Sequence, residues 1–327
     1  MIEFWTGALA LSIFLYVLLD GLDLGVGILF GFARNERDKE QMLHSIAPVW
    51  DGNETWLVIA AAVLFGAFPT VYALLLSAFY LPLILLLCGL IFRGVAFEFR
   101  ERSERLTHVW DAGFAVGSAI AAFVQGCAVG ALVLGLPNVD GRFTGGVFFW
   151  ARPFPVACGI GLCLGYALLG AGWLIKKTEG PVRERAYRQA AWLLLAVLLF
   201  LVTAFAFAIL LDLRVMNRWV ERPYLIAFPL LGALGVALIT FGMARWRDGL
   251  PLLGGILLFI AAYGTLAVSF LPYMVPFTIT YLDAAAPPSS LSFLFWFAGI
   301  IVLPLTLIYT AVSYSVFRGK IRSEDHY

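Results

Sequence analysis

Four acidic side chains lie within or beside long apolar segments of this sequence, where charge is rarely found. Asp20 and Asp23 are three residues apart, so on a helix they share one face. Asp51 and Glu54 repeat this spacing at the start of the next apolar segment. A charge at mid-bilayer costs about 2.5–3.5 kcal/mol on insertion scales, so these carboxyl groups must face protein or water. Carboxyl groups sheltered in this way can bind and release protons, and we therefore predict a proton path through all four acids.

The segment around Asp51 and Glu54 has a competing structural interpretation. Acids in a first helical turn are stabilised by the positive end of the helix dipole, so both could simply begin a helix. Trp50 and Trp56 would then anchor that helix at the membrane interface. The acid pair of the first segment could likewise only hold helices together. The similar predicted depth of all four acids favours the proton path.

A third apolar segment ends with Arg93 and Glu98, which are candidates for charge pairing. Arg93 could pair with one of the inner acids, or its long side chain could extend to the membrane surface. The sequence has no phosphate-binding loop, zinc-protease motif or Ser–His–Asp arrangement. We therefore predict no directly catalytic residue in this chain.

Residues that commonly bind metals are few and peripheral. The four cysteines stand singly in apolar runs and form no paired motif. The three histidines, His44, His108 and His326, lie in predicted loops or in the polar tail. Haem iron usually takes axial histidine ligands. We therefore predict no metal site in the chain and no haem ligated by this chain alone.

The composition places the supporting elements in a membrane. Hydrophobic residues make up 62% of the 327 residues and charged residues only 13%, whereas a typical soluble domain is about a quarter charged. The net charge of +1 gives no field for binding nucleic acid. Because spanning helices need about 20 apolar residues, we predict an all-α integral membrane protein with nine transmembrane helices: 4–32, 52–68, 72–98, 112–135, 154–175, 190–211, 225–244, 251–271 and 292–316.

The distribution of basic residues predicts the orientation of these helices. With the N-terminus in the periplasm, the outer side holds only five of the 22 Lys and Arg residues: Arg142, Arg152, Arg214, Arg218 and Arg222. Basic residues concentrate on the cytoplasmic side of membrane proteins, so this bias supports that orientation and a cytoplasmic C-terminus. The first helix has no basic segment before it and is expected to be retained. We predict one polytopic domain over residues 1–327, with a first bundle at about 1–135 and a second bundle plus an extra helix at about 150–318.

Four stretches of the sequence resemble subunit II of the cytochrome bd-type quinol oxidases, including the cyanide-insensitive branch. The stretches are DGLDLGVG at 20–27, SIAPVWDGNETW at 45–56, LFGAFP at 64–69 and FRGVAFEFR at 92–100. The second stretch is long and rich in the rare residue tryptophan, which makes it specific. The dense similarity covers about the first third of the chain, and later helices agree mainly in number and in the motifs at their ends.

This resemblance implies a subunit of a ubiquinol:oxygen terminal oxidase in the bacterial cytoplasmic (inner) membrane. Such a complex oxidises quinol, reduces oxygen to water and builds a proton-motive force because its protons come from the cytoplasm. It implies that subunit I carries two haems b and one haem d, and that this chain stabilises subunit I. Asp51, with Asp20 or Asp23, would deliver protons. Membrane lipids, ubiquinol and a small single-helix subunit are further expected partners.

Two other functions are compatible with the same residues. Subunit II could be a purely structural partner without a role in proton transfer. Alternatively, inner carboxylates and membrane prolines such as Pro82, Pro229 and Pro304 could suit a secondary transporter. No inverted repeat is visible, which weighs against the transporter.

Overall fold

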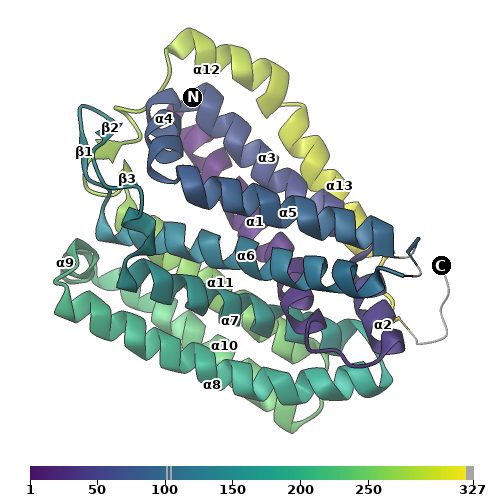
Figure 1. Cartoon of the computed structure of the whole chain (residues 1–327). Helices are drawn as coiled ribbons and strands as arrows, with labels where there is room; N and C mark the ends of the chain where they lie inside the picture. Colours follow the sequence, from purple (N-terminus) through teal and green to yellow (C-terminus); the bar gives the residue numbers. More distant parts are fainter. Residues whose placement is uncertain (101, 104, 322–327) are drawn as a thin grey trace.

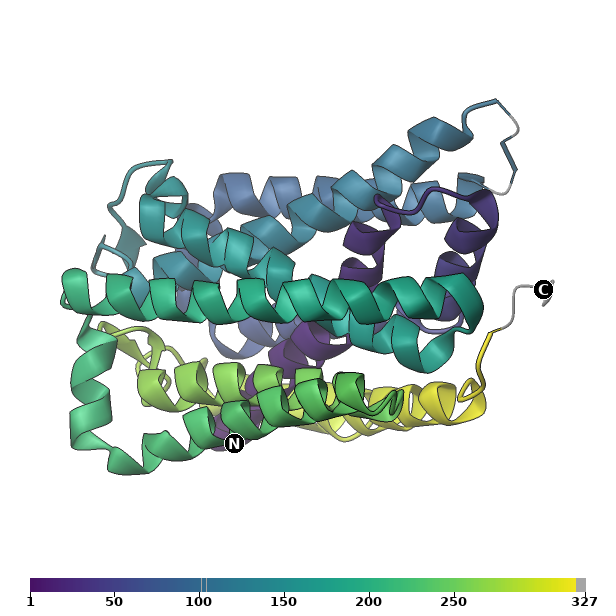
Figure 2. The same cartoon turned by 90° about the horizontal axis from the view of Figure 1, so that it is seen from below.

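The computed structural model describes residues 1–100, 102–103 and 105–321, apart from the side chain of Val220. Within this part the chain is a bundle of helices (Figure 1). Figure 2 shows that most of the helices run along one long axis and that the connections gather at the two ends. The tail histidine His326 lies outside the described residues.

Helices account for most of the described chain, because a backbone in lipid must satisfy its polar groups internally. The longer helices are α1 Ile2–Phe30, α2 Glu36–Ile46, α3 Trp50–Ala67, α4 Pro69–Ala78, α5 Tyr80–Arg100, α6 Thr107–Leu134, α7 Pro153–Lys177, α8 Gly180–Leu210, α9 Arg214–Glu221, α10 Ala227–Ala244, α11 Gly249–Phe270, α12 Pro288–Leu294 and α13 Val302–Val316. Three short helical turns are η1 Phe149–Ala151, η2 Pro223–Ile226 and the π-helical η3 Phe295–Gly299. Two small antiparallel hairpins pair β1 Asn138–Val139 with β2 Arg142–Phe143, and β3 Tyr273–Val275 with β4 Ile279–Thr280.

Eight apolar helical segments in the described residues are long enough to cross a membrane. They confirm an all-α integral membrane protein, and they correspond to eight of the nine segments predicted from the sequence. The remaining predicted segment, 52–68, is α3, a helix of 18 residues. Asp51, Asn53 and Glu54 make its first turns polar, which sets α3 apart from the other eight.

The segment predicted as one helix over 72–98 is interrupted at Phe79. The helix α4 ends at Ala78 and α5 begins at Tyr80, and Phe79 between them has φ −113° and ψ 25°. Proline has no N–H, and its ring crowds the carbonyl group four residues earlier. Pro82 therefore disfavours a continuous helix at Ala78, which is where α4 ends. The prediction of an uninterrupted helix was wrong at this point.

The polar joint predicted after the first helix also contains regular structure. The helix α2 occupies Glu36–Ile46 and buries Met42, Leu43 and Ile46. These side chains pack against α1 and α7 in the largest core cluster. The joint is polar in sequence because Glu36, Arg37 and Glu40 of α2 are charged and exposed, whereas only part of the helix is apolar.

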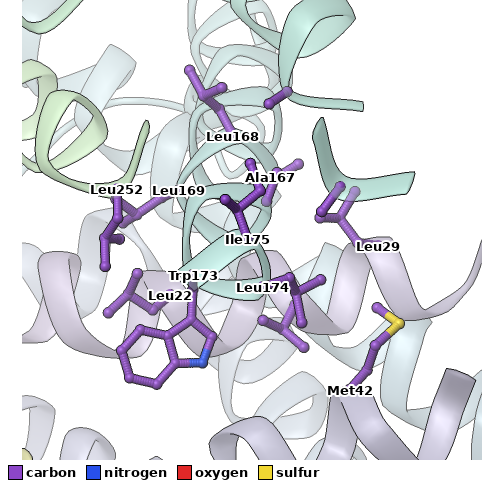
Figure 3. Close-up of a cluster of buried hydrophobic side chains, with 14 of the residues drawn as sticks. Leu22, Leu29, Met42, Ala167, Leu168, Leu169, Trp173, Leu174, Ile175 and Leu252 are labelled. Carbon is purple, nitrogen blue, oxygen red and sulfur yellow. The ribbon is translucent and has the colours of Figure 1, made fainter. Parts of the chain in front are cut away.

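The helix α1 lies at the centre of the bundle, in contact with α3, α6 and α7. Figure 3 shows Leu22 of α1 beside Trp173 and Leu174 of α7, within one apolar cluster. Lipid tails are as apolar as these side chains, so close packing rather than hydrophobicity must hold such helices together. The packing is closest where Gly25 of α1 meets the backbone of α7.

The C-terminal segment returns to the bundle and lies against α2 and the end of α7. The backbone N–H of Ile321 donates to the carbonyl oxygen of Lys177 at 2.7 Å, and the Gln41 side chain donates to the Ile321 carbonyl oxygen at 2.8 Å. The segment is thereby joined to α2 and to the end of α7.

Asp248 fixes the same segment from another side. Its carboxylate accepts hydrogen bonds from the Arg183 guanidinium at 2.7–3.1 Å, from the Tyr187 hydroxyl at 2.7 Å and from Lys320 Nζ at 2.6 Å. Partial burial alone would raise the pKa of Asp248, but these hydrogen bonds hold it at about 2. Asp248 therefore stabilises the fold as a carboxylate.

We expect Asp248→Asn to lower the thermal midpoint of the purified complex at neutral pH. Solvent screens this partly exposed site, so the fall should be only about 2–4 °C. Because the folded-state pKa lies below the unfolded value of about 3.9, the stabilisation is complete above about pH 5 and is lost as the pH falls toward 2. Melting curves between pH 8 and pH 3 should show the gap between wild type and variant narrowing in acid. A gap that widens in acid would contradict this assignment.

Candidate functional site

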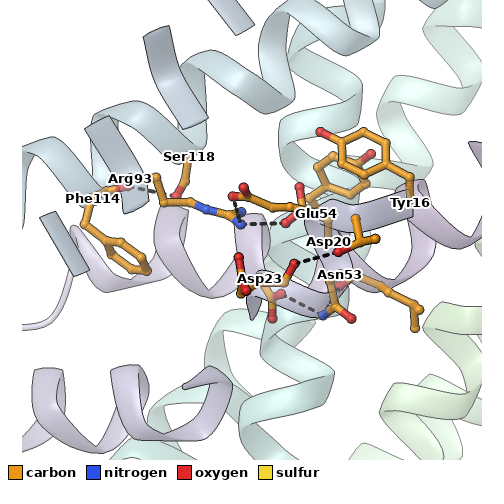
Figure 4. A network of polar contacts seen from close by, with 12 residues as sticks. Tyr16, Asp20, Asp23, Asn53, Glu54, Arg93, Phe114 and Ser118 are labelled. Atoms are coloured by element: carbon orange, nitrogen blue, oxygen red, sulfur yellow. Dashed lines mark hydrogen bonds and ion pairs between the residues drawn. The ribbon is translucent and has the colours of Figure 1, made fainter. Parts of the chain in front are cut away.

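Three helices bring buried charged side chains together inside the bundle. Arg93 of α5 donates from Nη2 to Asp20 Oδ1 of α1 at 2.7 Å and to Glu54 Oε1 of α3 at 2.6 Å (Figure 4). Arg93 therefore takes the first of the two roles that the sequence left open, because it pairs with the inner acids. One guanidinium joins carboxyl groups from two helices that are distant in sequence.

The second acid of α1 has a different partner. Asp23 Oδ2 accepts a hydrogen bond from Asn53 Nδ2 of α3 at 2.8 Å. The Asn53 amide is also within hydrogen-bond distance of the Tyr314 hydroxyl of α13, at 3.1 Å from Nδ2 and 3.3 Å from Oδ1. Asp23 is thus hydrogen-bonded to the neutral amide of Asn53, whereas Asp20 forms an ion pair with the Arg93 guanidinium.

The cluster is buried at its centre and partly exposed at Glu54. The exposed fractions of the Asp20 and Arg93 side chains are 0% and 1%, while that of Glu54 is 26%. Three buried polar atoms, Asp20 Oδ2, Asp23 Oδ1 and Arg93 Nη1, have no hydrogen-bond partner among the described residues. Buried polar atoms are usually paired, so the two carboxyl oxygens can still accept a proton or a hydrogen bond, and Arg93 Nη1 can still donate one to water or to another side chain.

The other predicted site residues lie outside this cluster. Asp51 is exposed in the first turn of α3, and its carboxylate has no hydrogen bond or ion pair among the described residues. Glu98 is exposed near the end of α5 and does not join Arg93. The Trp50 ring packs on Phe97 with the ring centroids 5.2 Å apart.

Trp56 is fully buried, and its indole N–H donates to Thr310 Oγ1 of α13 at 3.3 Å. This tryptophan therefore connects helices inside the protein and does not anchor α3 at the membrane interface. The competing structural interpretation of this segment had placed Trp56 at the interface, and the structure gives it a packing role instead.

The sequence is similar to known membrane proteins over most of its length. Residues 1–317 match the family model described as cytochrome bd terminal oxidase subunit II. The chain belongs to this family. It is 31% identical to the cytochrome bd-I ubiquinol oxidase subunit 2 of Escherichia coli K12, over 95% of this chain and 92% of that protein. It is 30% identical to the cytochrome bd ubiquinol oxidase subunit 2 of Bacillus subtilis, over 99% and 97% of the two chains.

A solved structure has the same fold. A chain of the bd oxidase from Geobacillus thermodenitrificans superposes with a TM-score of 0.76, at 14% sequence identity and over 97% of this chain and 98% of that chain. The protein is therefore subunit II of a cytochrome bd quinol oxidase, which is an oxidoreductase complex that contains haem and includes a subunit I. It is a multi-pass protein of the bacterial cytoplasmic membrane.

Within the part of the chain that the structure describes, no histidine lies inside the bundle, where it could ligate haem iron. Among the described residues, no group of three or more His, Cys, Asp or Glu side chains could hold a metal ion. The described histidines are His44 in α2 and His108 in the first turn of α6, both at helix ends and away from the bundle centre.

Several polar residues of subunit II that join the site were not predicted from the sequence. Asn53 lies between Asp51 and Glu54 in the stretch 45–56, and the sequence alone does not indicate its contact with Asp23. Gln125 is the only amide in the apolar helix α6, and Tyr16 precedes Asp20 by four residues. A lone amide in an apolar segment and a tyrosine one turn from a buried acid were the available signals.

Proposed function

We propose that this chain delivers protons from the cytoplasm to the oxygen-reducing subunit I of a ubiquinol oxidase. The observation that carries the proposal is the cluster of Asp20, Glu54 and Arg93, which runs from the buried interior of α1 to a partly exposed carboxyl group on α3. Protons consumed at the haems would then come from one side of the membrane, which builds a proton-motive force.

The charge balance of the cluster supports this function. Asp20, Asp23 and Glu54 face the single guanidinium of Arg93. Burying surplus unpaired charge is costly, so the cluster is favourable only when at least one carboxyl group holds a proton. A group that must hold a proton, and that lies beside an open edge, is suited to pass the proton on.

Asp51 supplies the outer end of the proposed path. Its exposed carboxylate lies in the same first turns of α3 as Glu54, three residues away, and acts electrostatically on Glu54. We propose the order Asp51, Glu54 and Asp20, with Asp23 beside the end of the path. The direction of transfer then follows from a cytoplasmic position of Asp51.

The topology that this path needs has nine spanning helices, with α3 as the ninth. The proposal places the N-terminus in the periplasm and the C-terminus in the cytoplasm, which agrees with the distribution of basic residues. We also propose one polytopic domain, with bundles at about 1–135 and 150–318, because α1 packs against both α3 and α7.

The uncovered face of α3 and α13 is the proposed contact with subunit I. Thr55 and Tyr309 are exposed there, and Tyr309 of α13 lies against Gly52 of α3. A polar face inside a membrane must be covered by protein or by a water-filled space. We propose that subunit I covers it and carries two haems b and one haem d. Ubiquinol, membrane lipids and a small single-helix subunit are the further proposed partners.

Asp51→Asn tests the function in the assembled oxidase. Oxygen consumption with ubiquinol as donor should fall about tenfold or more, because the uncharged amide cannot bind a transferable proton. The visible spectrum of the haems should stay unchanged. Asp140→Asn is the matched control, since Asp140 is exposed in the loop between β1 and β2 and its left-handed backbone suits Asn equally well.

A purely structural role is the second candidate, and the ion pairs that join α1, α3 and α5 favour it. In that case Asp51→Asn would leave the turnover per haem unchanged and would lower only the amount of complex. Turnover normalised to haem content therefore separates the two functions.

A further inference from the structure

A second network of buried polar side chains, formed by Tyr16, Gln125 and Tyr166, begins one turn away from Asp20. The Tyr166 hydroxyl of α7 donates to Gln125 Oε1 of α6 at 2.9 Å, and Gln125 Nε2 donates to the Tyr16 hydroxyl oxygen of α1 at 2.9 Å. Tyr16 is 4% exposed and Tyr166 is fully buried. Three hydrogen-bonding side chains from three helices are thus aligned inside an apolar bundle, and the proposed proton path uses none of them.

The hydrogen bonds of this network all run in one direction. The Gln125 amide accepts at its oxygen from Tyr166 and donates from its nitrogen to Tyr16. The Tyr16 oxygen accepts, which leaves the Tyr16 hydroxyl hydrogen free to donate elsewhere. A buried hydroxyl hydrogen without an acceptor is unfavourable, so an acceptor near Tyr16 is expected.

Asp20 offers that acceptor. Tyr16 and Asp20 are four residues apart on α1 and therefore share one face. Arg93 occupies Asp20 Oδ1, while Asp20 Oδ2 is buried and has no partner among the described residues. The Tyr16 hydroxyl is close enough to interact with the Asp20 carboxyl group. Figure 4 shows Tyr16 beside Asp20, on the side away from the Arg93 backbone.

The packing around Tyr166 holds one end of this network in place. Its ring lies against Gly21, where an added Cβ would come within 2.5 Å of Tyr166 Cε1. The ring also stacks on Phe259 of α11, with the centroids 5.5 Å apart and an interplanar angle of 9°. The Tyr166 hydroxyl is therefore fixed, and through Gln125 it fixes Tyr16.

We propose that Tyr16 is a positioning residue for Asp20: oriented by Gln125 and Tyr166, its hydroxyl donates to the second carboxylate oxygen and sets how readily Asp20 exchanges a proton. This inference rests on the proposed function, since it concerns the acid at the inner end of that path. It adds Tyr16, Gln125 and Tyr166 to the residues that determine the pH range of turnover.

Asp20 is also surrounded by other groups that titrate or carry charge. They are Asp23 of α1, Glu54 of α3, Arg93 of α5, Tyr166 of α7 and Tyr314 of α13. A variant that tests the inference must leave all five unchanged, and Tyr16→Phe does so because it removes a single oxygen atom.

The test compares oxygen consumption against pH for the assembled oxidase with Tyr16→Phe. A hydrogen bond to a carboxylate favours its charged form, so its loss favours the protonated form. The alkaline limb of the profile should therefore move to higher pH, by about one pH unit for one charge-assisted hydrogen bond. Tyr263→Phe is the matched control. The Tyr263 hydroxyl also donates to α1, to the carbonyl oxygen of Ala10 at 2.6 Å, but it does not belong to the network of Tyr16, Gln125 and Tyr166. Its profile should match that of the wild type.

Infrared difference spectra provide a second readout. The carboxyl stretching band that disappears in Asp20→Asn belongs to protonated Asp20, and this band should shift in Tyr16→Phe and stay in place in Tyr263→Phe. Gln125→Leu leaves the Tyr16 side chain intact and removes what orients it. It should give the same direction of change, and it serves if Tyr16→Phe fails to assemble.

The outcomes separate this inference from the proposed function. If Asp20→Asn slows turnover while both Tyr16→Phe and Gln125→Leu leave the pH profile and the band unchanged, the positioning role of Tyr16 is overturned and the proton path stands. If Asp20→Asn retains full turnover, the proton path fails, and a band shift in Tyr16→Phe would still support the contact.

Discussion

Arg93→Met is expected to remove most of the assembled oxidase from the membrane. The substitution keeps an unbranched apolar stem in place of the arginine stem but leaves Asp20 buried without its ion-pair partner and leaves Glu54 unpaired. Removing one partner of a buried ion pair costs about 3–5 kcal/mol. Haem content per milligram of membrane protein measures the loss. Arg247→Met is the control, because Arg247 is exposed at the start of α11 and should tolerate the change.

A compensated variant shows whether charge imbalance is the cause. Combining Arg93→Met with Asp20→Asn and Glu54→Gln removes the unpaired charges together, and replacing a whole buried ion-pair set is often nearly neutral. The assembled complex should return while turnover per haem stays low, because two acids of the proposed path are lost. Normal assembly of Arg93→Met alone would contradict the prediction, and so would a failure of the triple variant to recover.

Gly25→Ala is expected to push α1 away from α7 and to destabilise the assembled complex. An added Cβ would lie 2.6 Å from the Tyr166 carbonyl carbon and 2.9 Å from the backbone nitrogen of Gly170. Backbone atoms cannot turn away as a side chain can, so the helices must move apart. Overpacking of this kind costs typically about 1–3 kcal/mol, and more where backbone must shift.

The control for this variant is Gly7→Ala, since an added Cβ at Gly7 meets no atom within 4 Å. Both variants lie on α1 and add the same single methyl group. The thermal midpoint of the purified complex should fall for Gly25→Ala and stay unchanged for Gly7→Ala. Equal midpoints for the two would show that α1 and α7 do not depend on this close approach.

Much of the fold was predictable because lipid restricts the backbone to a few solutions. Apolar segments of about 20 residues must become helices there, so eight of the predicted spans appear, although the segment predicted over 72–98 begins only at Tyr80 and the one predicted over 190–211 begins already at Gly180. The irregularities were less predictable. The interruption at Phe79 depends on how Pro82 acts within its own helix, and α2 depends on a surface of α1 and α7 that the sequence of residues 36–46 does not contain.

The candidate site divides in the same way. The sequence alone determined which buried residues carry charge, because acids and an arginine in apolar segments require protein or water around them. Only the tertiary structure decided that Arg93 joins Asp20 to Glu54, that Asp51 and Glu98 stay outside, and that Tyr16 and Gln125 continue the network. The reason is geometric: spacing along one helix fixes which side chains share a face, whereas the rotation and approach of separate helices fix which faces meet.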